Sequence, residues 1–411
     1  MELIKITRNA LSQLTIRFSG SFATFLITLL ITEQLGLVSL GTFIKITSFV
    51  SIFYLLVDFG INTVYLRDNF DTVEEKFNHL ITLRLLLSTL VFVVVLIITY
   101  FLPSGNTTGF SQFDKLGIVI YSLTFFTEGL LVSFTGLLQK RLQQHALIVP
   151  SLVSSILIVV LVLLGIQQKN MLFILFAYPI AEAVQIIATL LFIKKKMMIS
   201  VIESGFKAFS KKTLVSAAPL ALMLFLNVVY FRVDTFILSL YSSTADVGAY
   251  GFSYKIFEFL IAFPTFLTAS MFPILIQHKN NAAEFSKKIR HYSLLLLVSS
   301  IVMSCMVFAF APLLVLFGGD VSPAILPLQI LSLSLPFFFL TSLFQWVLLL
   351  KHKVYLLVVL YATTMIINII LNVLYVPVFS YTASAVITVV SEVLVLLAMT
   401  IVLSLTKSEK Y

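Results

Sequence analysis

Long apolar stretches separated by short polar connections recur along the whole chain. Each stretch runs for roughly 20 residues, which is the length that a helix needs to cross the hydrocarbon core of a bilayer. The pattern predicts about twelve transmembrane helices. We expect them at residues 11–32, 37–57, 79–101, 114–138, 146–165, 171–193, 213–240, 249–276, 291–317, 324–350, 354–375 and 380–405.

The composition supports a membrane protein. Hydrophobic residues make up 60% of the chain and charged residues only 11%. A soluble domain has about half of its residues apolar and about a quarter charged, so it is excluded. We therefore predict an all-α polytopic membrane protein that contacts membrane lipids along most of its length.

Basic residues lie mainly in alternate connections between the predicted helices. These connections and the two termini hold 20 of the 27 lysines and arginines, whereas the other connections hold only Lys115 and Lys169. Because cytoplasmic loops carry the excess of basic residues, both termini are predicted to be cytoplasmic. The net charge of +9 then reflects orientation and attraction to anionic lipids, and no nucleic-acid partner is expected.

The longest basic connection, Lys194 to Lys212, divides the chain into two halves of six predicted helices. Its alternation of basic and apolar residues is typical of an amphipathic helix at the membrane surface. We predict an N-terminal six-helix lobe at 1–200 and a C-terminal one at 201–411, as in transporters built from duplicated lobes. A short repeat supports this: Gly41-Thr-Phe and Gly248-Ala-Tyr each open a predicted helix and precede a lysine.

The sequence contains little that favours an enzyme. The outer loops are short, and the largest, at 102–113, carries almost no charge. No phosphate-binding G-x-x-x-x-G-K sequence is present, and no two histidines have a metal-ligand spacing. We expect no catalytic residue, no cofactor and no metal. The lone cysteine, Cys305, excludes an intrachain disulfide.

Ionisable residues inside the predicted helices need an explanation, because each costs at least a few kcal/mol at the bilayer centre. Cations placed in succession from the inner to the outer side of the membrane would suit an anionic head group that has to cross it. For Arg17 and Arg84 the alternative is a side chain that reaches back to the interface. For Lys45, deep in its helix, lining of a cavity is favoured. The candidate substrate-binding cations are Arg17, Lys45, Arg84, Arg232 and Lys255.

The acidic residues inside the helices leave several interpretations open. Lys255 and Glu258, at i and i+3, can neutralise each other. Arg232 and Asp234, at i and i+2, cannot, so each needs a partner elsewhere. An acidic residue can be paired with a cation, protonated and inert, or a carrier of coupling protons. The candidate coupling or structural carboxylates are Glu128, Glu182, Asp234, Glu258 and Glu392.

Several motifs in order along the chain resemble one family. Residues 30–68 contain L-G-x-x-x-x-G, then Asp-Phe-Gly at the end of a predicted helix, then an arginine. Residues 232–234 (Arg-Val-Asp), 247–250 (Val-Gly-Ala-Tyr) and 368–377 (two asparagines and a proline) follow in the second half. The chain is similar to the polysaccharide-transporter branch of the multidrug/oligosaccharidyl-lipid/polysaccharide exporter (MOP) superfamily, the Wzx-like flippases. It departs where the family has glycines, at Ser380 and Ser384.

This resemblance implies two six-helix bundles of the MATE-like type around a V-shaped cavity that opens to either face of the membrane in turn. It implies a cargo of lipid-linked oligosaccharide, an undecaprenyl-pyrophosphate-linked glycan for O-antigen or another surface polysaccharide. It also implies a prokaryotic cytoplasmic membrane and partner proteins of polysaccharide assembly. Arg17 and Lys45 occupy positions where relatives have basic cavity residues. Arg232 and Lys255 match the family pattern less specifically.

Two alternatives remain. One is an ion-coupled exporter of drugs or organic cations with the same fold. It would need an acidic residue in the first helix, where this chain has Arg17. The other is a membrane scaffold of a glycan assembly complex. A scaffold gains nothing from costly charges inside the bilayer, so this alternative is disfavoured.

Overall fold

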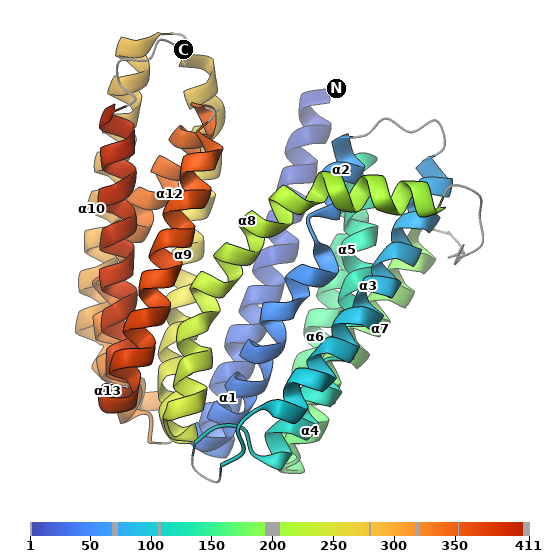
Figure 1. Cartoon of the computed structure of the whole chain (residues 1–411), viewed down its shortest axis with the longest axis vertical. Coiled ribbons are helices and arrows are strands. Elements are labelled where there is room, and N and C mark those ends of the chain that lie inside the picture. Colours follow the sequence, from blue (N-terminus) through green and yellow to red (C-terminus); the bar gives the residue numbers. More distant parts are fainter. Residues whose placement is uncertain are drawn as a thin grey trace. The chain divides into compact units, whose positions relative to one another are not determined.

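The computed structural model describes residues 2–67, 73–105, 108–193, 206–278, 281–317, 320–351 and 353–405, and these are almost entirely helical (Figure 1). Long apolar segments form helices because a helix satisfies every backbone polar group within one segment. By contacts between residues the chain forms two compact units. Unit 1 comprises Met1–Ile31 and Phe43–Val228, and unit 2 comprises Thr32–Thr42 and Val229–Tyr411.

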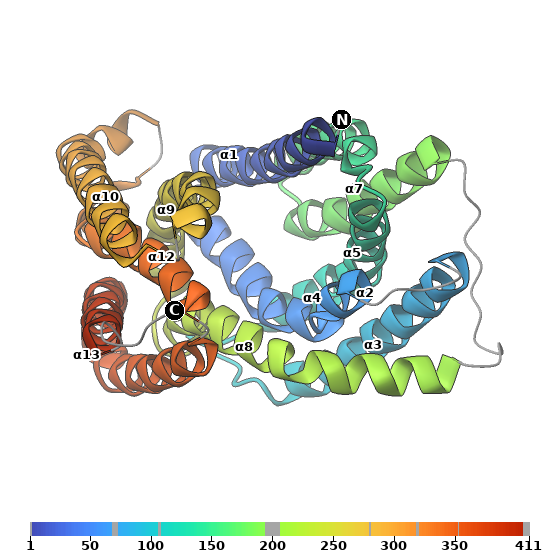
Figure 2. The same cartoon turned by 90° about the horizontal axis from the view of Figure 1, so that it is seen from above.

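Unit 1 is a bundle in which α6 packs on α7, and α5 packs on both α3 and α7 (Figure 2). Its apolar core includes Phe77, Leu80 and Phe134, all essentially inaccessible to solvent. The elements that lie largely in unit 1 are α1 (Glu2–Asp58), α2 (Ile61–Arg67), α3 (Val73–Phe101), α4 (Gln112–Tyr121), α5 (Thr124–Lys140), η1 (Gln144–Leu147), α6 (Ile148–Gln167) and α7 (Met171–Ile193).

Helix α8 (Phe206–Tyr241) runs through both units, since the boundary falls between Val228 and Val229. In unit 2, α12 packs on α9, α10 and α13. The core here includes Tyr230, Leu357 and Val395. The remaining elements of unit 2 are α9 (Thr244–His278), α10 (Ala282–Phe310), η2 (Ala311–Phe317), η3 (Ser322–Ala324), α11 (Ile325–Ser332), α12 (Leu335–Leu350) and α13 (Val354–Leu405).

The described helices agree in type and position with the predicted spans. Among them, eight are long and apolar enough to cross a membrane, or nine if the bent pair α11 and α12 counts as one span. Two of the eight hold two predicted spans each: α1 is interrupted at Gly36 and α13 at Ser380. The total of twelve and the cytoplasmic termini stay predictions. The predicted boundary at residue 200 lies outside the described residues, as does most of the predicted surface helix.

Two glycines bring α1 and α9 into close contact within unit 2. A Cβ atom added at Gly41 would overlap the backbone carbonyl of Thr244, and one added at Gly248 would overlap the carbonyl of Leu37. The contact is reciprocal, because each added Cβ would also approach the backbone nitrogen of the other glycine. The two copies of the short sequence repeat therefore pack against each other, and only glycine permits that approach.

Several charged residues lie inside the units, and many large apolar residues lie on their outer surface. Leu191 is 73% exposed and Leu316 is 79% exposed. By contrast Lys45, Arg84 and Glu392 are buried. A soluble protein would expose the charges and bury the leucines. The outer surface of each bundle is thus suited to contact with lipid.

Candidate functional site

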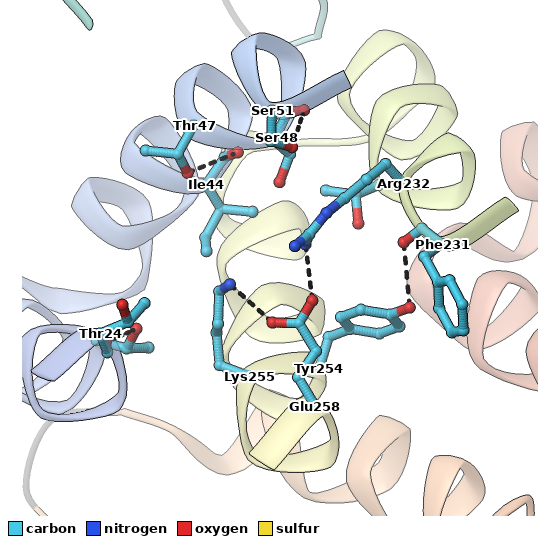
Figure 3. A network of polar contacts seen from close by, with 12 residues as sticks. Thr24, Ile44, Thr47, Ser48, Ser51, Phe231, Arg232, Tyr254, Lys255 and Glu258 are labelled. Atoms are coloured by element: carbon cyan, nitrogen blue, oxygen red, sulfur yellow. Dashed lines mark hydrogen bonds and ion pairs between the residues drawn. The ribbon is translucent and has the colours of Figure 1, made fainter. Parts of the chain in front are cut away.

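Three charged side chains form a group in unit 2 (Figure 3). The carboxylate of Glu258 accepts from Lys255 Nζ at 2.8 Å through one oxygen and lies 2.9 Å from Arg232 Nη1 through the other. Lys255 and Glu258 are one turn apart on α9, whereas Arg232 comes from α8. Tyr254 fastens the two helices here, because its hydroxyl donates to the carbonyl oxygen of Phe231 at 3.1 Å.

This group, which we call the Arg232–Lys255–Glu258 group, carries a net charge of +1. The predicted Lys255–Glu258 ion pair is present, but Arg232 adds a second cation to the same carboxylate. The side chains are 18–24% exposed, so they are not fully enclosed by protein. The group is therefore chemically suited to bind an anion.

Arg84 in unit 1 lies in a buried network. Its Nη2 donates to Asp58 Oδ1 at 2.9 Å and to Asn62 Oδ1 at 3.0 Å, and its Nη1 donates to Ser133 Oγ at 3.1 Å. The guanidinium is inaccessible to solvent, so it does not reach back to the membrane surface. Asp58 was not among the predicted site residues. The sequence feature that could have identified Asp58 was its position in the Asp-Phe-Gly motif.

The other two predicted cations of unit 1 differ in exposure. Lys45 is 1% exposed, and its Nζ donates to the carbonyl oxygen of Gly109 at 2.9 Å. It thereby fastens α1 to the connection between α3 and α4. Arg17 lies on the exposed surface of α1 and makes no hydrogen bond or ion pair with any other described residue. Of these two cations, Arg17 is the accessible one.

Two of the predicted carboxylates lie in unit 1 and are half-buried. Glu182 accepts a hydrogen bond from the Thr127 hydroxyl. Glu128 interacts electrostatically with both partners of the ion pair between Arg84 and Asp58. The two glutamates also interact with each other. The structure thus brings together residues of α1, α3, α5 and α7 that the sequence keeps apart.

The remaining two carboxylates, in unit 2, are almost fully buried. Asp234 accepts from the backbone nitrogen of Thr235 at 2.6 Å and from the Tyr250 hydroxyl. Glu392 accepts from the Tyr230 hydroxyl at 3.0 Å and from the Thr341 hydroxyl at 2.6 Å. The hydrogen-bond donors that hold these two carboxylates are therefore uncharged.

A chain of amide and hydroxyl groups joins the two halves of α13. Asn368 donates to Ser391 Oγ at 2.9 Å and accepts from Asn372 at 3.0 Å. Ser384, one of the two departures from the family's glycines, donates to Asn372 Oδ1 at 3.1 Å. The asparagine motif recognised in the sequence therefore forms a buried polar contact.

The structure groups only part of the predicted site. Arg232, Lys255 and Glu258 lie together, whereas Arg17, Lys45 and Arg84 occupy separate environments in unit 1. Among the described residues, no group of three or more His, Cys, Asp or Glu side chains could hold a metal ion.

Comparison with known proteins agrees with this architecture. The sequence model of the family described as "Polysaccharide biosynthesis protein" matches residues 6–279, and the MatE family model matches residues 219–374. No curated protein sequence matches the chain.

Solved structures show the same fold at low sequence identity. Lipid II flippase MurJ, in an inward closed conformation, has a TM-score of 0.74 at 15% identity, over 96% of this chain and 87% of that one. An inward-facing multidrug resistance MATE family transporter of the MOP superfamily has a TM-score of 0.72 at 13% identity, over 95% and 96%. A MOP superfamily transporter from Pyrococcus furiosus, described as having a binding pocket of reverse polarity, has a TM-score of 0.51 at 13% identity. The match covers 99% of this chain and 95% of that one.

The family match covers well over half of the chain. The solved structures reported above that share its fold are a flippase and transporters. The described helices include at least eight that can cross a membrane. The chain therefore belongs to the polysaccharide biosynthesis protein family, and it is a multi-pass membrane protein with the fold of MOP superfamily transporters.

Proposed function

We propose that this transporter is a flippase that moves a polyprenyl-pyrophosphate-linked oligosaccharide across a prokaryotic cytoplasmic membrane for the synthesis of cell-surface polysaccharide. The observation that carries the proposal is the net positive, partly exposed Arg232–Lys255–Glu258 group inside a membrane bundle. A charge there is costly unless it serves a ligand. A pyrophosphate supplies several anionic oxygens to the lysine and arginine donors.

In the proposed mechanism the head group binds to cations while the lipid tail stays in the bilayer. Arg17, exposed on α1, is the candidate for first capture, and Arg232 with Lys255 then hold the pyrophosphate. Alternating access of the two lobes would move the head group. Lys45 and Arg84 remain candidates, but each would have to exchange a protein oxygen for a phosphate oxygen. Other polysaccharide assembly proteins would deliver and receive the glycan.

The test is translocation of a fluorescent polyprenyl-pyrophosphate oligosaccharide in proteoliposomes at matched protein insertion. Arg232→Gln and Lys255→Gln should each lower the affinity for the lipid by about tenfold or more, because each removes a charged hydrogen-bond donor. Arg17→Gln should slow capture. The matched control is Lys169→Gln, which removes a basic residue of the predicted outer connections and should leave transport unchanged. If wild type moves no lipid, the proposal is wrong.

The ion-coupled cation exporter remains the alternative, and Glu258→Gln separates it from the flippase. This substitution removes the only acidic side chain of the group and raises its charge from +1 to +2. A pyrophosphate lipid should then bind several-fold more tightly, whereas an organic cation should bind more weakly. If the protein binds and moves neither class of compound, a scaffold function in a glycan assembly complex is favoured over both transport functions.

A further inference from the structure

Glu392 is a buried membrane carboxyl that the proposed lipid path does not use. It lies on the second half of α13 with 3% of its surface exposed. Its two hydrogen-bond partners are the hydroxyls of Tyr230 on α8 and Thr341 on α12. No lysine, arginine or histidine among the residues that the structure describes is bonded to it. A charged carboxylate is costly in such an environment, and adding a proton removes that cost.

The other ionisable groups around Glu392 are tyrosines. Tyr230 comes from α8, and Tyr361 on α13 and Tyr254 on α9 interact with Glu392 electrostatically. Helix α12 contributes Thr341, and α11 (ILPLQILS) contains no ionisable residue. Each of these tyrosines carries an uncharged hydroxyl near neutral pH. Within the described part of the chain, no cation pairs with Glu392 and would hold it permanently charged.

Thr341 allows the carboxyl to change its protonation state without loss of a hydrogen bond. Besides Glu392 Oε1, its hydroxyl lies 3.2 Å from the carbonyl oxygen of Phe338, a second acceptor. When Glu392 is charged, the Thr341 hydroxyl donates to it. When a proton from water has bonded to Oε1, the carboxyl donates to Thr341 and the threonine hydrogen turns to Phe338. Tyr230 can donate to Oε2 in both states, so every group stays satisfied.

We propose that Glu392 is a reversible proton-binding site, with the Thr341 hydroxyl as its donor–acceptor switch. This inference goes beyond the lipid flippase function and does not depend on it.

The proton would also change how firmly α8 is held near the Arg232–Lys255–Glu258 group. A hydrogen bond to a charged acceptor is roughly twice as strong as one to a neutral acceptor. Loss of the charge on Glu392 therefore weakens the contact from Tyr230, two residues before Arg232 on α8. The next residue, Phe231, is bonded through its carbonyl oxygen to Tyr254 of α9, beside Lys255. Proton binding at Glu392 is thereby linked to the position of Arg232, whatever ligand that cation binds.

Infrared difference spectroscopy of the purified full chain across a pH series tests the proton site without any substrate. The wild type should show a protonated-carboxyl band that disappears as the pH rises. Glu392→Gln should remove the part of this band that arises from Glu392 and still fold, since its amide can donate to Thr341 and accept from Tyr230. The matched control is Glu258→Gln, which changes a carboxylate held by two cations and should leave the band in place.

A second variant guards against loss of folding. Thr341→Val preserves the side-chain shape and removes the switch, so the frequency of the band should change; Thr341→Ser should restore it. A band of unchanged intensity in Glu392→Gln, or of unchanged frequency in Thr341→Val, overturns the proposal, as does a wild type with no titrating band. Linkage to the substrate is measured separately, as the pH dependence of binding of the pyrophosphate lipid. Failure of that binding alone would count against the flippase proposal.

Discussion

At the scale of single residues, the contribution of each charged side chain to stability or to ligand binding depends on its partners and its exposure. Arg84, Lys45, Arg232 and Lys255 are all basic residues within apolar helices, yet Arg84 and Lys45 are enclosed by protein oxygens and the other two are partly exposed. Burial of a cation without its partner is costly, whereas a partly exposed cation keeps contact with water. Mutations of the two kinds of cation should therefore affect different properties.

Arg84 is expected to act on stability. Arg84→Lys should destabilise the protein by about 2–4 kcal/mol, because a lysine cannot reproduce the three hydrogen bonds to Asp58, Asn62 and Ser133. Thermal unfolding in detergent measures the effect. Lys255→Arg serves as the control, because its partly exposed site can accommodate the larger cation; equal destabilisation by the two changes would contradict this role for Arg84.

Ser380 carries backbone strain in the break of α13. Its φ of 49° is a conformation that favours glycine, and its hydroxyl donates to Asp246 Oδ2 at 3.1 Å. Ser380→Ala and Ser380→Gly both remove this hydrogen bond, but only alanine retains the strain. The alanine variant should therefore be less stable than the glycine variant by about 1–3 kcal/mol. Equal melting temperatures for the two variants would show that the backbone is relaxed here.

At the scale of helices, hydropathy located the elements well. The predicted span 171–193 coincides with α7, and the predicted break before residue 37 lies beside Gly36. The predicted span at 114–138 coincides with one candidate membrane span, Gln112–Lys140, which a turn at Ser122 and Leu123 divides into α4 and α5. Two short helices with a continuous apolar pattern give the same hydropathy signal as one long helix.

The partners of buried charges could be predicted only within a single helix. Lys255 and Glu258 are three residues apart, so helical geometry was sufficient to pair them. Arg84 pairs with Asp58 across 26 positions, and Glu392 with Tyr230 across 162. Such pairs depend on which helices pack together and in which rotation, and periodicity in one sequence does not contain that information.

The glycine contact between α1 and α9 gives a prediction at this scale. Gly41→Ala and Gly248→Ala should each destabilise unit 2 by about 1–3 kcal/mol, because the added methyl group meets backbone rather than a flexible side chain. Gly20→Ala is the matched control on α1: no atom lies within 4 Å of its added Cβ. Helix propensity should make that change neutral or slightly stabilising.

The double variant Gly41→Ala, Gly248→Ala sharpens the test. Once one methyl group has separated the helices, the second should cost less, so the two effects on unfolding should sum to more than the effect of the double variant. Strict additivity would show that the glycines do not share one contact.

At the scale of the whole molecule, the distribution of basic residues predicts orientation. In a Cys305→Ser background, a membrane-impermeant maleimide added to intact cells should label Ser104→Cys, which is exposed between α3 and α4. It should not label Gln143→Cys, exposed between α5 and α6, until the cells are permeabilised. The opposite labelling would reverse the predicted topology and with it the assignment of inner and outer cations.

The assignment of Thr32–Thr42 to unit 2 has a consequence for biosynthesis. This segment is made early, but Gly248, the backbone contact of Gly41, is made about 200 residues later. At the usual rate of about 5–20 residues per second, the ribosome needs about 10–40 s to reach it. Unit 2 therefore cannot begin to pack around Gly41 until α9 has been made. Thr32–Thr42 must stay without its α9 contact until that helix has been synthesised.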